Sequence, residues 1–176
     1  MKAWKHFCTI TYHKSLVAKG CFAVGLYWQG IMHDMSKYSF TEFRVGAKYF
    51  QGTRSPNNAE KEDIGYSSAW LHHKGRNKHH LEYWLDYGFP PDKRITGMRM
   101  PEKYVVEMFM DRIAACKVYM GDNYHDNAPY EYYERGKEIT PLHEETRELL
   151  SRMLKMLGEK GEKETFAYVK KEVLHK

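Results

Sequence analysis

Cysteine is scarce in this chain, and long apolar runs and clear strand patterns are missing. Only three cysteines occur, Cys8, Cys21 and Cys116, and they lie far apart. An odd, scattered set argues against a disulfide framework and against a cysteine-based zinc site. It favours reduced thiols, and we therefore expect a cytoplasmic protein.

No apolar run is long enough to span a bilayer. The longest covers residues 21 to 32 and is interrupted by Gly25, Gln29 and Gly30, whereas a spanning helix needs about 20 apolar residues. The first six residues also lack the apolar segment of a secretory signal. We expect no membrane partner.

The charge is only modestly positive. A net charge of +5 arises from 28 basic and 23 acidic residues, and the two kinds are interleaved without a stripe of one sign. This distribution suits a small phosphorylated or nucleotide ligand and does not favour nucleic acid, although it does not exclude it. The oligomeric state stays open, with a homodimer as one alternative.

Helical spacing dominates the chain. With 176 residues, of which 42% are hydrophobic, the sequence fits one folded domain rather than a disordered chain. Alternating strand patterns are missing apart from residues 9–12. The spacing predicts an all-α bundle of about seven to eight helices, with a fourth helix that is interrupted near Gly75. The predicted ranges are 3–18, 21–33, 39–50, 61–73 resuming at 78–87, 101–120, 130–135, 141–157 and 164–174.

Several helix ends carry recognisable signals. Gly20 is expected to stop the first helix, and a break is expected between Gly158 and Gly161. Ser39 followed by Glu42 fits a capping box, in which the first residue caps the third helix. Pro101 suits the first turn of a long helix.

Two positions early in the chain offer metal ligands. His33 and Asp34 are adjacent and close an apolar run, and imidazole and carboxylate groups both bind divalent ions. The alternative is a helix end, with Asp34 as a cap and His33 as a dipole partner. His13 lies in the middle of the first helix, where a surface or core role is the alternative.

Four histidines then follow within nine residues: His72, His73, His79 and His80. A solvated basic segment is one explanation. However, the neighbouring Trp70 and other apolar residues indicate that the segment packs against a core.

Glu107 and Asp111 are four residues apart in an otherwise apolar helix, so they share one face. Ionised carboxylates cannot stay unpaired in such a place. They need a metal ion, histidines to orient, or a neutralising cation such as Arg112 or Lys103, and these alternatives remain open.

The order of these residues resembles the HD superfamily of metal-dependent phosphohydrolases. These helical bundles carry a leading His, a His-Asp doublet, extra histidines in some branches and a late Asp. His13, His33, Asp34 and Asp111 match that order. The resemblance implies a single HD-like helical domain over 1–176, with a metal-site core at about 3–120 and C-terminal helices at about 128–176.

Three segments look more closely like an uncharacterised bacterial and phage family. They are the run from His33 to Ser39, the two histidine pairs with the Glu82-Tyr83-Trp84 that follows them, and the run from Glu107 to Asp111. Members of that family have largely no assigned function, so the closer resemblance implies no substrate.

The HD resemblance implies one or two divalent metal ions. His13, His33, Asp34 and Asp111 would hold the first. A second ion would be bridged by Asp34 and held by His73 and His80, with His72 and His79 as alternatives or supporting residues. The gap between the two histidine pairs differs from most HD branches and leaves the pairing of ligands open. A mixed histidine and carboxylate set favours Fe, Mn, Co or Zn over Mg.

The expected activity is hydrolysis of a nucleotide or another small phosphate ester. Asp34, Lys37 and Glu107 are the predicted catalytic residues, and Glu107 would orient a histidine or move a proton. Lys37, Arg76 and Asn77 are the predicted substrate contacts, and Lys74 and Arg112 are further candidates. One alternative is an HD-type di-iron oxygenase, and another is a non-enzymatic nucleic-acid- or protein-binding module with a structural metal.

Overall fold

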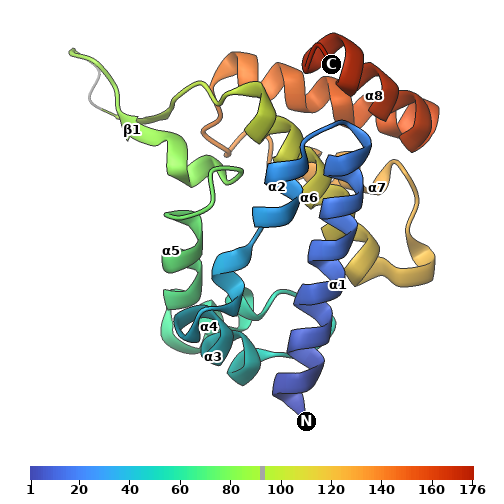
Figure 1. Cartoon of the computed structure of the whole chain (residues 1–176). Coiled ribbons are helices and arrows are strands. Elements are labelled where there is room, and N and C mark those ends of the chain that lie inside the picture. Colours follow the sequence, from blue (N-terminus) through green and yellow to red (C-terminus); the bar gives the residue numbers. More distant parts are fainter. Residues whose placement is uncertain (92–93) are drawn as a thin grey trace.

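The computed structural model describes residues 1–91 and 94–176 and is an all-α bundle, as the helical spacing predicted (Figure 1). Eight α-helices lie within these residues, together with short 3₁₀ segments and one small hairpin. The helices are α1 (Lys2–Ala23), α2 (Tyr27–Met32), α3 (Phe40–Tyr49), α4 (Pro56–Ile64), α5 (Ser68–Lys74), α6 (Glu102–Met120), α7 (Ala128–Glu134) and α8 (Glu144–Tyr168).

The helices α1 and α6 lie side by side (Figure 1). At their contact, a Cβ atom on Gly20 would lie 2.7 Å from the sulfur of Met110. Gly20 therefore permits close packing inside α1 and does not end it. The predicted stop at this glycine is wrong, because the tertiary contact favours a helix that continues to Ala23.

The apolar core lies between α1, α6 and α8. The helix α6 is buried on nearly every side, which explains its continuous apolar sequence. Opposite it, α8 contributes leucines and a methionine with no exposed surface. The fully buried core residues of the three helices are Val17, Cys21, Val105, Val106, Phe109, Leu150, Met153, Leu154 and Leu157.

The fourth predicted helix, 61–73, is wrong as one element. The helix α4 begins with Pro56 in its first turn and Ser55 as its cap, and it ends at Gly65, whose φ of 83° is left-handed. A new helix, α5, follows and is capped by Ser67, whose side chain accepts a hydrogen bond from the backbone N–H of Trp70. The caps at Gly65 and Ser67 therefore divide this segment into two helices, although its apolar pattern continues across the division.

The predicted continuation as a helix over 78–87 is also wrong. After α5 the chain turns, forms a 3₁₀ segment at Leu81–Trp84, and enters strand β1 (Leu85–Tyr87). Strand β1 pairs antiparallel with β2 (Ile95–Gly97). The predicted interruption at Gly75 is confirmed, since α5 ends there.

The break predicted between Gly158 and Gly161 is confirmed. Gly161, with φ 75° and ψ 175°, is non-helical and divides α8 into two helical parts. After α8 the chain continues to a π-helical segment at Val169–Val173. Although α8 has 25 residues, no helix in the described part of the chain is both long and apolar enough to cross a membrane.

Candidate metal centre

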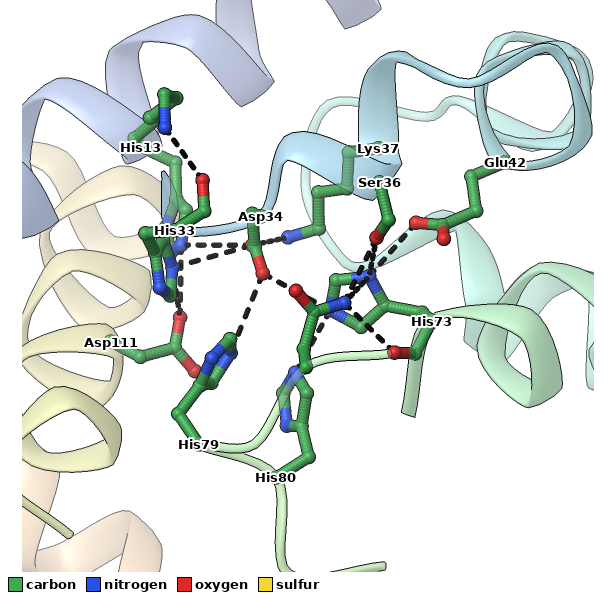
Figure 2. A network of polar contacts seen from close by, with 12 residues as sticks. His13, His33, Asp34, Ser36, Lys37, Glu42, His73, His79, His80 and Asp111 are labelled. Atoms are coloured by element: carbon green, nitrogen blue, oxygen red, sulfur yellow. Dashed lines mark hydrogen bonds and ion pairs between the residues drawn. The ribbon is translucent and has the colours of Figure 1, made fainter. Parts of the chain in front are cut away.

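Asp34 stands in the middle of a cluster of buried histidines and carboxylates (Figure 2). Helix α2 ends at Met32, and Asp34 then takes a left-handed backbone conformation with φ 54° and ψ 23°. Residues other than glycine rarely adopt it, although Asp and Asn tolerate it best. The turn buries two consecutive side chains, His33 at 1% and Asp34 at 2% exposure. Backbone strain of this kind concentrates at functional sites.

The first group of potential ligands joins α1, the turn at Asp34 and α6. His13 Nε2 lies 2.9 Å from Asp111 Oδ1 and 3.8 Å from Asp34 Oδ2. His33 Nε2 lies 3.4 Å from Asp34 Oδ2 and 3.5 Å from Asp111 Oδ1. One donor atom from each of the four residues lies within 4.8 Å of the others. The structure therefore brings the predicted first ligand set together.

Asp34 also belongs to a second group. Its Oδ1 lies 3.2 Å from His73 Nε2 and 3.4 Å from His79 Nε2. His80 completes the group, with its Nε2 2.8 Å from that of His73. Oδ2 of Asp34 therefore faces the first group and Oδ1 faces the second.

Glu107 orients two of these histidines from α6. Its Oε1 accepts a hydrogen bond from His33 Nδ1 at 2.9 Å and lies 3.1 Å from His79 Nδ1. This leaves the Nε2 atom of each ring facing the cluster. No ion pair in residues 1–91 or 94–176 joins Glu107 to Arg112 or Lys103, so histidines, not these cations, are its partners.

Glu42 orients a third histidine, His73. This role of Glu42 was not predicted from the sequence. Its Oε2 accepts a hydrogen bond from His73 Nδ1 at 2.8 Å, while Oε1 lies 2.6 Å from His72 Nδ1. The only sequence signal was its position after Ser39. The backbone N–H of Glu42 does donate to Ser39 Oγ, at 3.4 Å, but the carboxylate binds histidines instead of closing the capping box.

His72 and His79 were predicted as alternative ligands, and the structure separates them. His79 is 1% exposed and lies in the cluster, within two of the potential ligand groups. His72 belongs to none of them and pairs with Glu42 at the edge. The turn after α5 explains the difference, since it breaks the helical register between the two histidine pairs.

Asn77 holds that turn in place. Its Nδ2 donates to the carbonyl oxygen of His73 at 2.8 Å and to Ser36 Oγ at 2.9 Å. The predicted substrate contact is therefore occupied by internal hydrogen bonds, and Asn77 fixes the loop that carries His79 and His80. Ser36, which was not predicted, joins this loop to the segment after Asp34.

The polar atoms at the centre lack hydrogen-bond partners. Five buried atoms have no partner in hydrogen-bonding geometry among the described residues, although Asp34 Oδ2 forms an ion pair with Lys37: His13 Nε2, His33 Nε2, His79 Nε2, Asp34 Oδ1 and Asp34 Oδ2. Buried polar groups are nearly always satisfied. Nitrogen and oxygen donors that converge without satisfying one another fit a divalent metal ion.

Neighbouring charges shift the pKa values of the buried acids and histidines at the centre. Burial alone would raise the pKa of Asp34, but His33 and Lys37 hold it well below its usual value. Burial likewise opposes ionisation of Asp111, and the close approach of His13 and His33 holds its pKa low. Burial, together with nearby His79, lowers the pKa of His80 far below its usual value. The pKa shifts therefore favour ionised carboxylates and a neutral His80. The same carboxylates raise the pKa of His33 and His73, so metal binding would displace a proton from these rings.

A cavity of about 750 Å³ opens beside the cluster. Some of the predicted substrate contacts line it and others do not. Lys37 and Arg112 lie on its wall, and Lys37 Nζ is 2.6 Å from Asp34 Oδ2. Lys74 and Arg76 are not among its lining residues. Arg76 is exposed, and its Nη1 donates to the carbonyl oxygen of His72 at 3.1 Å. Neither Arg76 nor Asn77 lines this cavity, and their substrate roles stay predictions.

A scan against protein families found one match, over residues 2–156, to a family of unknown function, DUF5662. The chain belongs to this family. The matched range contains every residue of the cluster, so the candidate centre lies within the DUF5662 segment. Neither the curated proteins nor the solved structures gave a match.

Proposed function

We propose that this DUF5662 protein is a divalent-metal-dependent phosphohydrolase that acts on a nucleotide or another small phosphate ester. One observation carries the proposal. His33, His73 and His79 turn their Nδ1 atoms toward buried carboxylates and their Nε2 atoms toward Asp34. Carboxylate–histidine pairs of this kind fix the tautomer that metal binding requires.

The donor set has room for two ions that share Asp34. His13, His33 and Asp111 complete one group, and His73, His79 and His80 complete the other. Histidine-rich sets with carboxylates favour Fe, Mn, Co or Zn over Mg. The order of these residues along the chain also resembles that of the HD superfamily, and that resemblance is the source of the proposed reaction.

A bound divalent ion would polarise a phosphoryl group and lower the pKa of a nearby water. The chain supplies the remaining functions. Lys37 contacts Asp34 and faces the cavity, so its ammonium group can bind a phosphoryl oxygen beside the centre. Glu107 holds His33 and His79 in place and excludes other orientations of the two rings.

The reaction is tested by screening tag-free protein against nucleotides and small phosphate esters with Mn²⁺, Co²⁺ and Mg²⁺. We expect release of phosphate that depends on the metal and disappears in Asp34→Asn. Asn retains the left-handed conformation better than Ala, so this variant removes charge with little added strain. The matched control is Asp122→Asn, an exposed carboxylate outside the cluster. Equal hydrolysis by both variants would contradict the proposal.

A di-iron oxygenase is the second candidate, and the number of histidines at the centre favours it. Iron in the purified protein, an absorption band in the visible or near-UV region and consumption of O₂ would support oxidation. Their absence in iron-loaded protein would leave hydrolysis as the better account.

A further inference from the structure

Arg112 is a cation on the cavity wall, and no acid in the described part of the chain forms an ion pair with it. It follows Asp111 on α6, and its Nε atom is buried without a hydrogen-bond partner. The centroid of the Tyr133 ring lies 5.7 Å from Arg112 Cζ. The ring covers one side of the guanidinium but cannot neutralise it.

A buried charge without a partner is costly, so it indicates a missing anion. A guanidinium remains charged at any ordinary pH. Its planar fork of N–H donors matches a phosphate or a carboxylate.

A second arginine faces the same region from the end of α7. Arg135 lines the cavity with Arg112, and both cations act on the thiol of Cys116, whose pKa burial raises. Besides Asp111, the acid Glu131 lines this side. Its carboxylate already accepts a hydrogen bond from Asn127 at 2.9 Å, and it has no ion pair with either arginine.

We propose that Arg112, assisted by Arg135, forms an anion subsite beside the metal centre, and that the substrate therefore carries two anionic groups. One group binds at Asp34 and Lys37, which rests on the proposed function. The second, a phosphate or a carboxylate, binds Arg112. The adjacency of Asp111 and Arg112 on one helix sets the two positions next to each other within one cavity.

The subsite is tested first without metal, so that the result does not depend on catalysis. Inorganic phosphate is titrated into EDTA-treated protein by calorimetry. We expect Arg112→Gln to weaken phosphate binding about tenfold or more, as the loss of a charged hydrogen-bond donor implies. The control is Arg54→Gln, which changes another arginine of the cavity wall. Arg54 already pairs with Glu62 at 2.5 Å, so its loss should leave binding unchanged.

Two probes identify the second anionic group on Mn²⁺-loaded protein. Methylenediphosphonate carries two phosphonates, and phosphonoacetate carries one phosphonate and one carboxylate. The probe that loses more affinity in R112Q identifies the preferred group. If R112Q does not fold, Arg112→Lys and Arg135→Gln replace it, and each should weaken binding by a smaller factor.

The two proposals fail separately. Phosphate binding that depends on Arg112, in a protein that hydrolyses no ester with any metal, supports the subsite and contradicts the proposed function. Wild-type affinity for all three probes in the folded Arg112 and Arg135 variants overturns the subsite, as does an equal loss in R54Q.

Discussion

At the scale of single residues, the direction in which each imidazole faces defines the centre. Three histidines donate from Nδ1 to Glu42 or Glu107, so their Nε2 atoms face Asp34. The sequence predicted most of the inward-facing residues because they are chemically conspicuous. It did not identify Glu42, because a helix cap explains an acid at that position equally well.

The orienting role of Glu107 leads to a prediction. Glu107→Gln keeps the size of the side chain but removes the charge that holds His33 and His79. We expect metal affinity to fall about 10- to 100-fold, measured by competition with a chromophoric chelator. Glu102→Gln, an exposed acid in the first turn of the same helix, is the control. An E107Q protein with wild-type affinity would show that the hydrogen bonds are incidental.

His6 predicts how stability changes with pH. Burial, reinforced by Lys37, lowers its pKa from 6.5 to about 4. Below pH 6.5 His6 binds a proton in the unfolded chain but not in the folded chain. The free energy of unfolding therefore falls as the pH drops from about 6.5 to about 4. Thermal unfolding of metal-free protein should show a shallower pH dependence in His6→Gln over this range. Parallel curves for the two proteins would exclude this role.

At the scale of elements, the helical spacing of apolar residues predicts the bounds of a helix well where no turn interrupts it. It fails where side-chain hydrogen bonds fix a turn. The helices α3 and α6 lie close to their predicted ranges. The region after Gly75 reads as a helix, but Asn77 and Ser36 fix a turn there. Those hydrogen bonds are formed with residues distant in sequence, and no local pattern reports them.

Close packing between α1 and α3 predicts a cost at one glycine. A Cβ atom on Gly46 would lie 2.2 Å from Nε2 of His6, and the ring is confined by Phe43 and Phe50. We expect Gly46→Ala to reduce the free energy of unfolding by about 1–3 kcal/mol, measured by urea denaturation. Gly75→Ala is the control, because the nearest atom is 3.6 Å away. An unchanged free energy of unfolding in G46A would mean that the α1–α3 interface adjusts to the added methyl group without cost.

At the scale of the whole molecule, the centre joins segments far apart in sequence. His13 comes from α1, Asp34 from the turn after α2, His73 from α5 and Asp111 from α6. From the sequence, the only reason to expect these residues to meet was that their order along the chain resembles that of the HD superfamily. Their distances and the two separate groups around Asp34 depend on how the helices pack, which periodicity does not specify.

Because an ion would tie these segments together, metal should stabilise the fold. Binding to the folded state alone contributes about 2.7 kcal/mol at a free metal concentration 100 times the dissociation constant. We expect Mn²⁺ or Zn²⁺ to raise the unfolding temperature of EDTA-treated protein, and D122N to respond as the wild type does. An identical rise in Asp111→Asn would place the bound ion elsewhere.

The central claim, a metal centre around Asp34, is tested most directly by elemental analysis of tag-free protein after incubation with Mn²⁺, Co²⁺, Zn²⁺ or Fe²⁺ and removal of free ions. The account predicts one or two bound ions in the wild type and in D122N, and loss of bound metal in D34N. A wild-type protein that stays metal-free with every ion, or a D34N variant that retains the full amount, would contradict it.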